Sequence, residues 1–200
     1  MAIGPCESDP MRSIGTVVLA AGAGTRLGGV AKALLPSRHG GTFLDQIVAT
    51  AREAGTRSII VVVGPPWGAD VAAHAGTLGV GIVENLEPER GMASSIATGF
   101  AAMLETDCTH AWLWPVDHPN ASLETLHALL AAIGSRDVAK PIVNGRGGHP
   151  PLIARRVFEL LAGCTDSPNG ARDVLGVADA IAVEVADVGS IRDIDTPEDL

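Results

Sequence analysis

A glycine-rich segment at residues 19–32 carries the first residues whose types could do chemistry. Gly22 and Gly24 would let backbone N–H groups approach an anion, and Arg26 and Lys32 would add charge-assisted hydrogen bonds. This combination is typical of a loop that binds a triphosphate. A turn needed only for packing would not require Arg26 and Lys32 at its far end.

Two better-known phosphate motifs do not fit this segment. A P-loop needs a glycine followed by Lys and Ser or Thr, whereas Gly28 is followed by Gly29 and Val30. A dinucleotide fingerprint needs a third glycine where Leu27 stands, and the next apolar run ends without a ribose-binding acid. By itself the segment therefore indicates only a loop that binds phosphate.

A single carboxylate, Asp117, follows the apolar run 112–116. A carboxylate at the end of a strand and near a triphosphate loop can hold Mg²⁺, which prefers one or two carboxylates together with phosphate oxygens. The alternative is that Asp117 only caps the turn before His118-Pro119. His118 itself is interpreted as a solvent-facing turn residue.

Apolar runs and helical patterns alternate along the chain and must position these residues. Strands are predicted at 14–20, 58–63, 80–84, 111–116, 138–143 and 181–185. Helices are predicted at 43–54, 67–75, 94–104, 122–133 and 151–161, the first with Thr42 as its N-cap. This alternation indicates βαβ units, hence a three-layer α/β/α fold with a mainly parallel sheet. The loops after residues 20, 84 and 116 should converge on one site.

Composition sets the broad class of the protein. With 200 residues the chain suits one domain, 14–200, preceded by a disordered or loosely packed tail, 1–13. A net charge of −9 argues against a nucleic-acid partner. Cys6, Cys108 and Cys164 form no CxxC pair and are expected to be free thiols. No apolar run could span a membrane, so a cytoplasmic protein without membrane contact is expected.

The segment 19–32 closely resembles the LAxGxxxRxGxxK signature of the MobA-like NTP transferases, and within that family the molybdenum cofactor cytidylyltransferases. The resemblance covers nearly all of residues 14–200 and implies a Rossmann-like fold of the nucleotide-diphospho-sugar transferase type. It implies that small residues wrap the nucleotide and that basic residues hold the triphosphate; the matching positions are Leu19, Ala20, Ala21, Gly22, Arg26 and Lys32. Arg26, Lys32 and Asp117 are the implied catalytic residues.

Two further segments resemble the metal-binding parts of this family. Asp117 matches the aspartate of its PxDxP segment, which binds Mg²⁺, and Asp195 matches an aspartate of its DIDTPEDL ending, which can complete the metal site. The residues after Asp195 also form a plain helix start, because Pro197 suits the first helical position. Magnesium is the expected cofactor.

The resemblance extends to the base and the acceptor. Asn85, Ser94 and Ser95 match a segment that lines the nucleotide pocket, although either serine could instead cap a helix. Arg146 and His149 match a segment near the acceptor, and the alternative is a flexible hairpin. The chain departs from the cytidylyltransferase pattern at Gly147, where a second basic residue would stand.

The predicted function is transfer of an NMP unit from an NTP to a small phosphorylated acceptor such as molybdopterin, with release of pyrophosphate. Ala21 favours CTP, because an LAAG loop is associated with cytidylyl transfer and an LAGG loop with guanylyl transfer in this family. The alternatives are a guanylyl or sugar-1-phosphate nucleotidyltransferase and a catalytically silent nucleotide-binding domain. The resemblance also implies transient contact with a molybdoenzyme or a chaperone.

Overall fold

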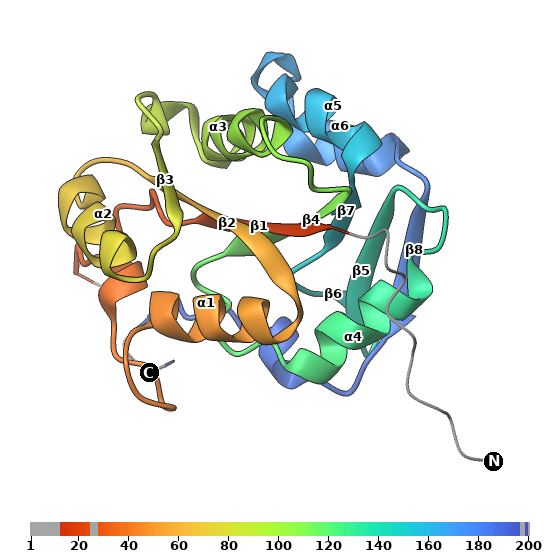
Figure 1. The fold of residues 1–200 in the computed structure, drawn as a ribbon, viewed down its shortest axis with the longest axis horizontal. Coiled ribbons are helices and arrows are strands. Elements are labelled where there is room, and N and C mark those ends of the chain that lie inside the picture. The colour runs from red at the N-terminus through yellow and green to blue at the C-terminus, as the bar shows by residue number, and fades with distance from the viewer. Residues whose placement is uncertain (1–12, 25–27, 197–198, 200) are drawn as a thin grey trace.

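The structure, a computed structural model, describes residues 13–24, 28–196 and 199 (Figure 1). Its strands are β1 (Ile14–Leu19), β2 (Thr56–Val63), β3 (Gly81–Glu84), β4 (His110–Pro115), β5 (Val138–Val143), β6 (Arg146–Gly147), β7 (Leu152–Ala154) and β8 (Ala180–Glu184). Its α-helices are α1 (Phe43–Glu53), α2 (Gly68–Thr77), α3 (Met92–Leu104), α4 (Leu123–Ala132), α5 (Phe158–Ala162) and α6 (Ala171–Val177). Short 3-10 helices include η2 (Lys32–Leu34), η3 (Pro88–Arg90), η4 (Arg155–Val157), η5 (Cys164–Asp166) and η6 (Val188–Ser190).

Within the described residues the strands form one sheet in the order β3-β2-β1-β4-β7-β5-β6, with β8 paired to β5. β1 pairs in parallel with β2 and β4, and β2 pairs in parallel with β3. The antiparallel pairs of the sheet are β4 with β7, β5 with β7 and β5 with β6. The part of the sheet around the glycine-rich loop is therefore wholly parallel.

Helices cover both faces of the sheet, and Figure 1 shows α3, α5 and α6 on one side and α1 and α4 on the other. Successive residues of β1 belong to different cores. Val18 packs with Leu44 of α1 in one core, whereas Val17 packs with Phe100 of α3 in the other. Because both faces are buried, the strand reads as an unbroken apolar run. The predicted three-layer α/β/α fold is confirmed.

Thr42 begins α1 as predicted. Its hydroxyl accepts a hydrogen bond from the Asp45 backbone N–H at 3.2 Å, and its own N–H donates to the Asp45 carboxylate at 2.7 Å. This reciprocal capping box satisfies two N–H groups that helix geometry leaves without partners. Gly55, with φ at 82°, follows the end of the helix.

The predicted helix at 151–161 is wrong in its first half. Leu152–Ala154 is strand β7, which lies antiparallel between β4 and β5. Leu152 and Ile153 are completely buried there. An apolar run this short has no distinguishing periodicity, so the unpaired edges of β4 and β5 decide its conformation. Only Phe158–Ala162 forms an α-helix.

Other predictions concern the tail and the thiols. The tail 1–13 lies outside the described residues except for Ser13, and Cys6 lies within that tail. Cys108 and Cys164 are buried free thiols, as expected. No helix in the described ranges combines the length and the apolar character needed to cross a bilayer.

Candidate active site

A cleft of about 590 Å³ lies where the parallel strands end. Its lining comes from the loop after β1, the segment after β3, the loop after β4 and the C-terminal tail. The three loops thus meet at one site, as the expected strand order requires. The cleft-lining residues that the sequence singled out are Leu19, Ala21, Gly22, Gly24, Lys32, Ser95, Asp117 and Asp195.

The loop after β1 is held in shape by glycine and by one tryptophan. Gly24 has φ at 61°, and a Cβ atom there would lie only 2.0 Å from the carbonyl oxygen of Val30. The Gly24 carbonyl accepts a hydrogen bond from the Gly29 N–H at 3.0 Å. The indole N–H of Trp67 donates to the Ala23 carbonyl at 3.3 Å, and Trp67 is a positioning residue that the sequence reasoning missed.

Two residues assigned to this loop need separate mention. Arg26, predicted to be catalytic and to bind the triphosphate, lies outside the described residues. Ala20 is buried, and its N–H donates to the Val62 carbonyl at 2.9 Å in an extension of the β1–β2 pairing. Ala20 is not part of the cleft lining, whereas Ala21 is.

Lys32, Asp117 and Asp195 form a charged cluster in the cleft. The Lys32 Nζ lies 3.5 Å from Asp117 Oδ2 and donates a hydrogen bond to Asp195 Oδ1. The side chains are 13%, 26% and 23% exposed in the same order. The backbone N–H of Ile194 donates to the Asp117 carbonyl at 2.9 Å, which brings the C-terminal tail to the end of β4. Tertiary contacts therefore join residues that are far apart in sequence.

The carboxylates of this cluster fit a hard divalent cation. Mg²⁺ commonly takes one or two protein carboxylates and completes its shell with water and substrate phosphates. No group of three or more His, Cys, Asp or Glu side chains with metal-site geometry occurs among the described residues. Two carboxylates beside the glycine-rich loop suit a metal whose remaining ligands come from water or a phosphate better than a permanently held structural metal.

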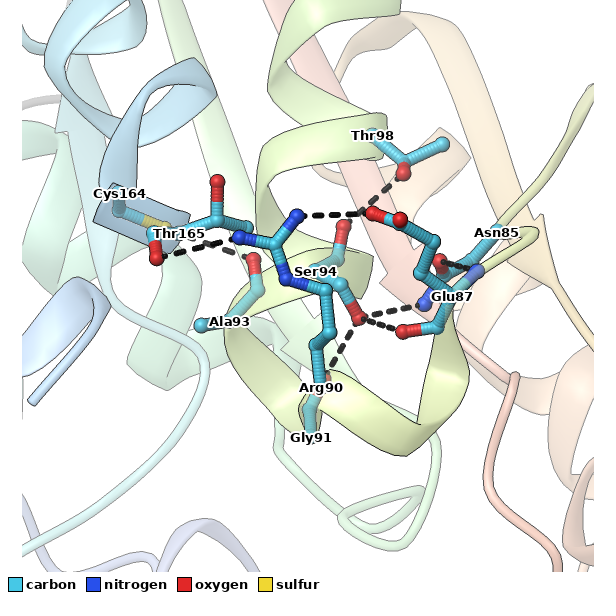
Figure 2. A network of polar contacts seen from close by, with 9 residues as sticks. All are labelled: Asn85, Glu87, Arg90, Gly91, Ala93, Ser94, Thr98, Cys164 and Thr165. Carbon is cyan, nitrogen blue, oxygen red and sulfur yellow. Dashed lines mark hydrogen bonds and ion pairs between the residues drawn. The ribbon is translucent and has the colours of Figure 1, made fainter. Parts of the chain in front are cut away.

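Asn85 lies behind the cleft wall, at the end of β3. Its amide nitrogen donates to the hydroxyls of Ser94 and Ser95 at 2.8 and 2.9 Å, and its amide oxygen accepts from the Glu87 N–H at 2.9 Å. Figure 2 shows Asn85 and Ser94 within this network. Asn85 is 2% exposed. Both amide protons and the amide oxygen are thus engaged within the protein.

The two serines assigned to the nucleotide pocket lie differently. The Ser94 hydroxyl is within 2.8 Å of the Glu87 and Gly91 carbonyl oxygens and is not part of the cleft lining, whereas Ser95 lines the cleft. Neither serine caps α3 with its side chain, because the N-cap is Gly91. Of Asn85, Ser94 and Ser95, only Ser95 therefore lies at the cleft surface.

The segment 86–93, between Asn85 and Ser94, forms part of the cleft wall and is called the wall segment. Two contacts visible in Figure 2 tie it to η5. The Arg90 guanidinium donates to the Glu87 carboxylate at 2.8 Å and to the Thr165 carbonyl at 3.5 Å. The Cys164 thiol donates to the Ala93 carbonyl at 3.5 Å, and burial raises the pKa of this thiol. These contacts hold the start of α3 against the segment before α6.

Arg146 and His149, assigned to the acceptor, are placed apart from the cleft lining. Arg146 is exposed on β6, in a hairpin with β5 whose turn holds Asn144 and Gly145 at φ 50° and 78°. Arg146 thus lies in a hairpin, and the acceptor roles of Arg146 and His149 stay predictions. The His149 N–H donates to the Ser190 carbonyl at 2.8 Å, and its ring contacts His118 with 4.7 Å between centroids.

His118 is not the solvent-facing turn residue that was expected. It is half-buried against His149, and its carbonyl accepts from the Trp114 indole N–H at 2.9 Å. Burial lowers the pKa of both histidines, that of His149 to about 4. The adjacent imidazoles favour the neutral state, because a second positive charge would be repelled. Sequence distance between residues 118 and 149 concealed this contact.

Several cleft residues were missed by the sequence reasoning. They come from the segments after β2 and β3 and include Pro65, Pro88 and Glu89. Gly64, next to Pro65, packs closely against two other segments, because a Cβ atom there would lie 3.0 Å from the Ala21 Cβ and 3.2 Å from the Asn85 carbonyl oxygen. The run Gly64-Pro65-Pro66 after β2 was the available signal, since such a run directly after a parallel strand marks a constrained loop at the binding edge.

Comparison with known proteins identifies the family of the chain. The profile of the MobA-like NTP transferase domain matches residues 16–183. The chain is 32% identical to nicotine blue oxidoreductase of Paenarthrobacter nicotinovorans, over 92% of this chain and 93% of that protein. It is 28% identical to molybdenum cofactor cytidylyltransferase of Escherichia coli (strain K12), over 94% of each protein.

Solved structures show the same architecture. Rv0371c from Mycobacterium tuberculosis H37Rv superimposes with a TM-score of 0.76 and 27% identity, over 94% of this chain and 96% of that one. The same protein has been solved in complex with manganese, with a TM-score of 0.70 to this chain. The chain belongs to the MobA-like NTP transferase family, and its fold is of the nucleotide-diphospho-sugar transferase type.

Proposed function

We propose that this member of the MobA-like NTP transferase family transfers an NMP unit, preferably CMP, from an NTP to a small phosphorylated acceptor such as molybdopterin. The observation that carries the proposal is the meeting of Lys32, Asp117 and Asp195 in a cleft that is also lined by the glycine-rich loop. A cation, two carboxylates and backbone N–H groups together suit a triphosphate and its metal.

In the proposed reaction an acceptor phosphate oxygen forms a bond to the α-phosphorus of the NTP. The bond from that phosphorus to the oxygen bridging the α- and β-phosphates breaks, and the bond electrons leave with pyrophosphate. Lys32 stabilises the negative charge on the phosphates, and Arg26 is proposed to do the same. The acceptor phosphate is already ionised at neutral pH, so the reaction requires no general base.

A divalent metal ion fits the proposal. Asp117 and Asp195 would hold it, and the ion would supply charge neutralisation for the triphosphate when bound. The manganese complex of Rv0371c supports the use of a divalent metal within this structural group. Magnesium is the metal we propose for this chain.

The preference for CTP rests on Ala21 and on the cytidylyltransferase relative. Ala21 lines the cleft, and its Cβ packs where Gly64 leaves space. The acceptor-binding roles of Arg146 and His149 stay predictions. His149 contacts His118, which directly follows Asp117, whereas Arg146 lies on an exposed hairpin. Of the two residues, His149 is therefore the one that a described contact, its ring contact with His118, connects to the neighbourhood of the proposed metal site.

A second candidate function comes from the relative named nicotine blue oxidoreductase, which covers 92% of this chain. This likeness favours an oxidoreductase that acts on nicotine blue or a similar compound. It predicts binding of a nicotinamide cofactor, for which the glycine-rich loop lacks the dinucleotide fingerprint. Guanylyl transfer, sugar-1-phosphate nucleotidyl transfer and catalytically silent nucleotide binding remain further alternatives.

The test is a thermal-shift screen of the four NTPs with Mg²⁺, followed by pyrophosphate release with molybdopterin and with sugar 1-phosphates. We expect CTP to raise the melting temperature most and molybdopterin to support pyrophosphate release. Parallel titration with NADH and absorbance of nicotine blue tests the oxidoreductase. Tight NADH binding without any response to CTP and Mg²⁺ would overturn the proposal.

A further inference from the structure

Lys32 contacts both carboxylates that are proposed to bind metal. It is the first residue of η2, whereas Asp117 follows β4 and Asp195 belongs to the C-terminal tail. The ammonium donates to Asp195 and lies 3.5 Å from Asp117, and the Lys32 side chain is only 13% exposed. One positive charge thus joins two negative charges from separate parts of the chain.

We propose that Lys32 is an internal cation that a divalent metal displaces, so that metal binding and nucleotide binding are coupled through this side chain. The inference rests on the proposed function, because it takes Asp117 and Asp195 as the metal ligands. It adds that Lys32 has two alternative anionic partners, the carboxylates and the nucleotide phosphates.

Competition for the same oxygens is the first step of the argument. Two carboxylates repel each other unless a cation lies between them, and Lys32 supplies that cation here. A divalent metal would need the same carboxylate oxygens. Because two cations at such short range repel, the metal and the Lys32 ammonium cannot both occupy positions between these carboxylates.

The second step concerns where the displaced ammonium goes. Lys32 lines the cleft together with Ala21 and Gly22 of the glycine-rich loop. Phosphates bound to this loop would therefore lie near the Lys32 side chain. A largely buried ammonium that leaves two carboxylates needs another anion. Without nucleotide the metal must displace Lys32 at a cost, whereas with nucleotide the ammonium gains a new partner.

Manganese binding to variants tests the coupling, because Mn²⁺ affinity can be measured by electron paramagnetic resonance without turnover. Lys32→Met is compared with the unchanged protein and with Lys140→Met. Lys140 is the other lysine of the chain and is exposed on β5, so its variant controls for the lost charge. Each protein is measured alone and with the non-hydrolysable analogue α,β-methylene-CTP.

Without nucleotide we expect Lys32→Met to bind Mn²⁺ about tenfold more tightly than the unchanged protein, and Lys140→Met to match the unchanged protein. With the analogue we expect the advantage to vanish or reverse. Equal or weaker Mn²⁺ binding by Lys32→Met without nucleotide would overturn the inference. Absence of nucleotidyl transfer would count against the proposed function alone, because these measurements include no acceptor.

A measurement on the unchanged protein covers the case in which Lys32→Met does not fold. Labelling with ¹³C-lysine gives signals from two lysines, and the spectrum of Lys140→Met assigns them. Saturating Mg²⁺ without nucleotide should shift the Lys32 side-chain signals and leave those of Lys140 in place. An unmoved Lys32 signal at saturating Mg²⁺ would overturn the inference.

Discussion

The side-chain amide of Asn85 donates a hydrogen bond to the Ser94 hydroxyl at 2.8 Å, and both residues are buried behind the cleft wall. The wall segment between them includes Pro88, Glu89 and Gly91, all of which line the cleft. We therefore expect Asn85 to act on the proposed nucleotide site through the backbone that it holds. A residue with this role should affect the shape of the site and the stability of the protein together.

Asn85→Ala would leave the Ser94 and Ser95 hydroxyls and the Glu87 N–H without this partner. We expect the free energy of unfolding to fall by about 2–4 kcal/mol, because buried polar groups lose their hydrogen bonds. The nucleotide KM should rise about tenfold with a smaller change in kcat. Urea unfolding and steady-state kinetics measure both effects.

Thr98→Val is the matched control for Asn85. Thr98 donates to the Ser94 carbonyl at 2.9 Å within α3, so its loss should leave the wall in place. Full stability of Asn85→Ala together with lost discrimination between NTPs would instead indicate a direct contact of Asn85 with the base.

Asp117→Asn should abolish turnover while nucleotide binding stays measurable. The substitution removes a carboxylate charge but keeps the backbone contact with Ile194. We expect kcat to fall at least about a hundredfold, because the proposed metal loses a charged ligand. Asp193→Asn removes a nearby acid that does not line the cleft and serves as the control. Unchanged pyrophosphate release by Asp117→Asn would refute its assignment.

Gly24→Ala and Gly22→Ala should distinguish a glycine that the loop conformation requires from a glycine that leaves room for the nucleotide. A methyl group at Gly24 would clash with the Val30 carbonyl oxygen, and the φ of 61° at this position is unfavourable for alanine. We therefore expect Gly24→Ala to lower the free energy of unfolding by about 1–3 kcal/mol. A methyl group at Gly22 meets nothing within 4 Å and should leave stability nearly unchanged while weakening nucleotide binding. Chemical unfolding and calorimetric titration with CTP distinguish the two. Equal stability of both variants would contradict this account.

Ala21→Gly should shift base preference towards GTP. The ratio of kcat/KM for CTP to that for GTP is expected to fall about tenfold, within the range that one methyl group can supply. Ala23→Gly alters another alanine of the cleft lining and should leave the ratio unchanged. If both variants behave alike, the base is not selected at Ala21.

The free energy of unfolding should fall as the pH decreases from about 6.5 to about 4. In the folded protein burial lowers the pKa of His149 to about 4, whereas an exposed histidine in the unfolded chain titrates near 6.5. In this window the unfolded chain binds a proton that folded His149 does not, so acid favours unfolding.

His149 alone could account for up to about 3 kcal/mol of this pH dependence. The pKa of His118 is also lowered by burial, and it acts in the same direction. Urea unfolding at several pH values should give a shallower dependence for His149→Gln than for the unchanged protein. Identical slopes would show that His149 is protonated as easily in the folded state as in the unfolded one.

The sequence by itself determined the layered fold and the edge at which the site lies. The apolar run of β1 and the Thr42 cap of α1 depend on neighbouring residues, so local patterns suffice to predict them. Parallel strands end at a common edge, which is why the loops carrying Ala21 and Asp117 could be placed together before any coordinates.

Only the tertiary structure decided which side chains meet and which way they face. Leu152–Ala154 became a strand because β4 and β5 each offered an unpaired edge. Asn85 faces inward because Ser94 and Ser95 lie beside it, and His118 is half-buried because His149 packs on it. The Lys32 contact with Asp195 spans 163 positions. Such contacts depend on packing between distant segments, and no local periodicity or capping pattern encodes them.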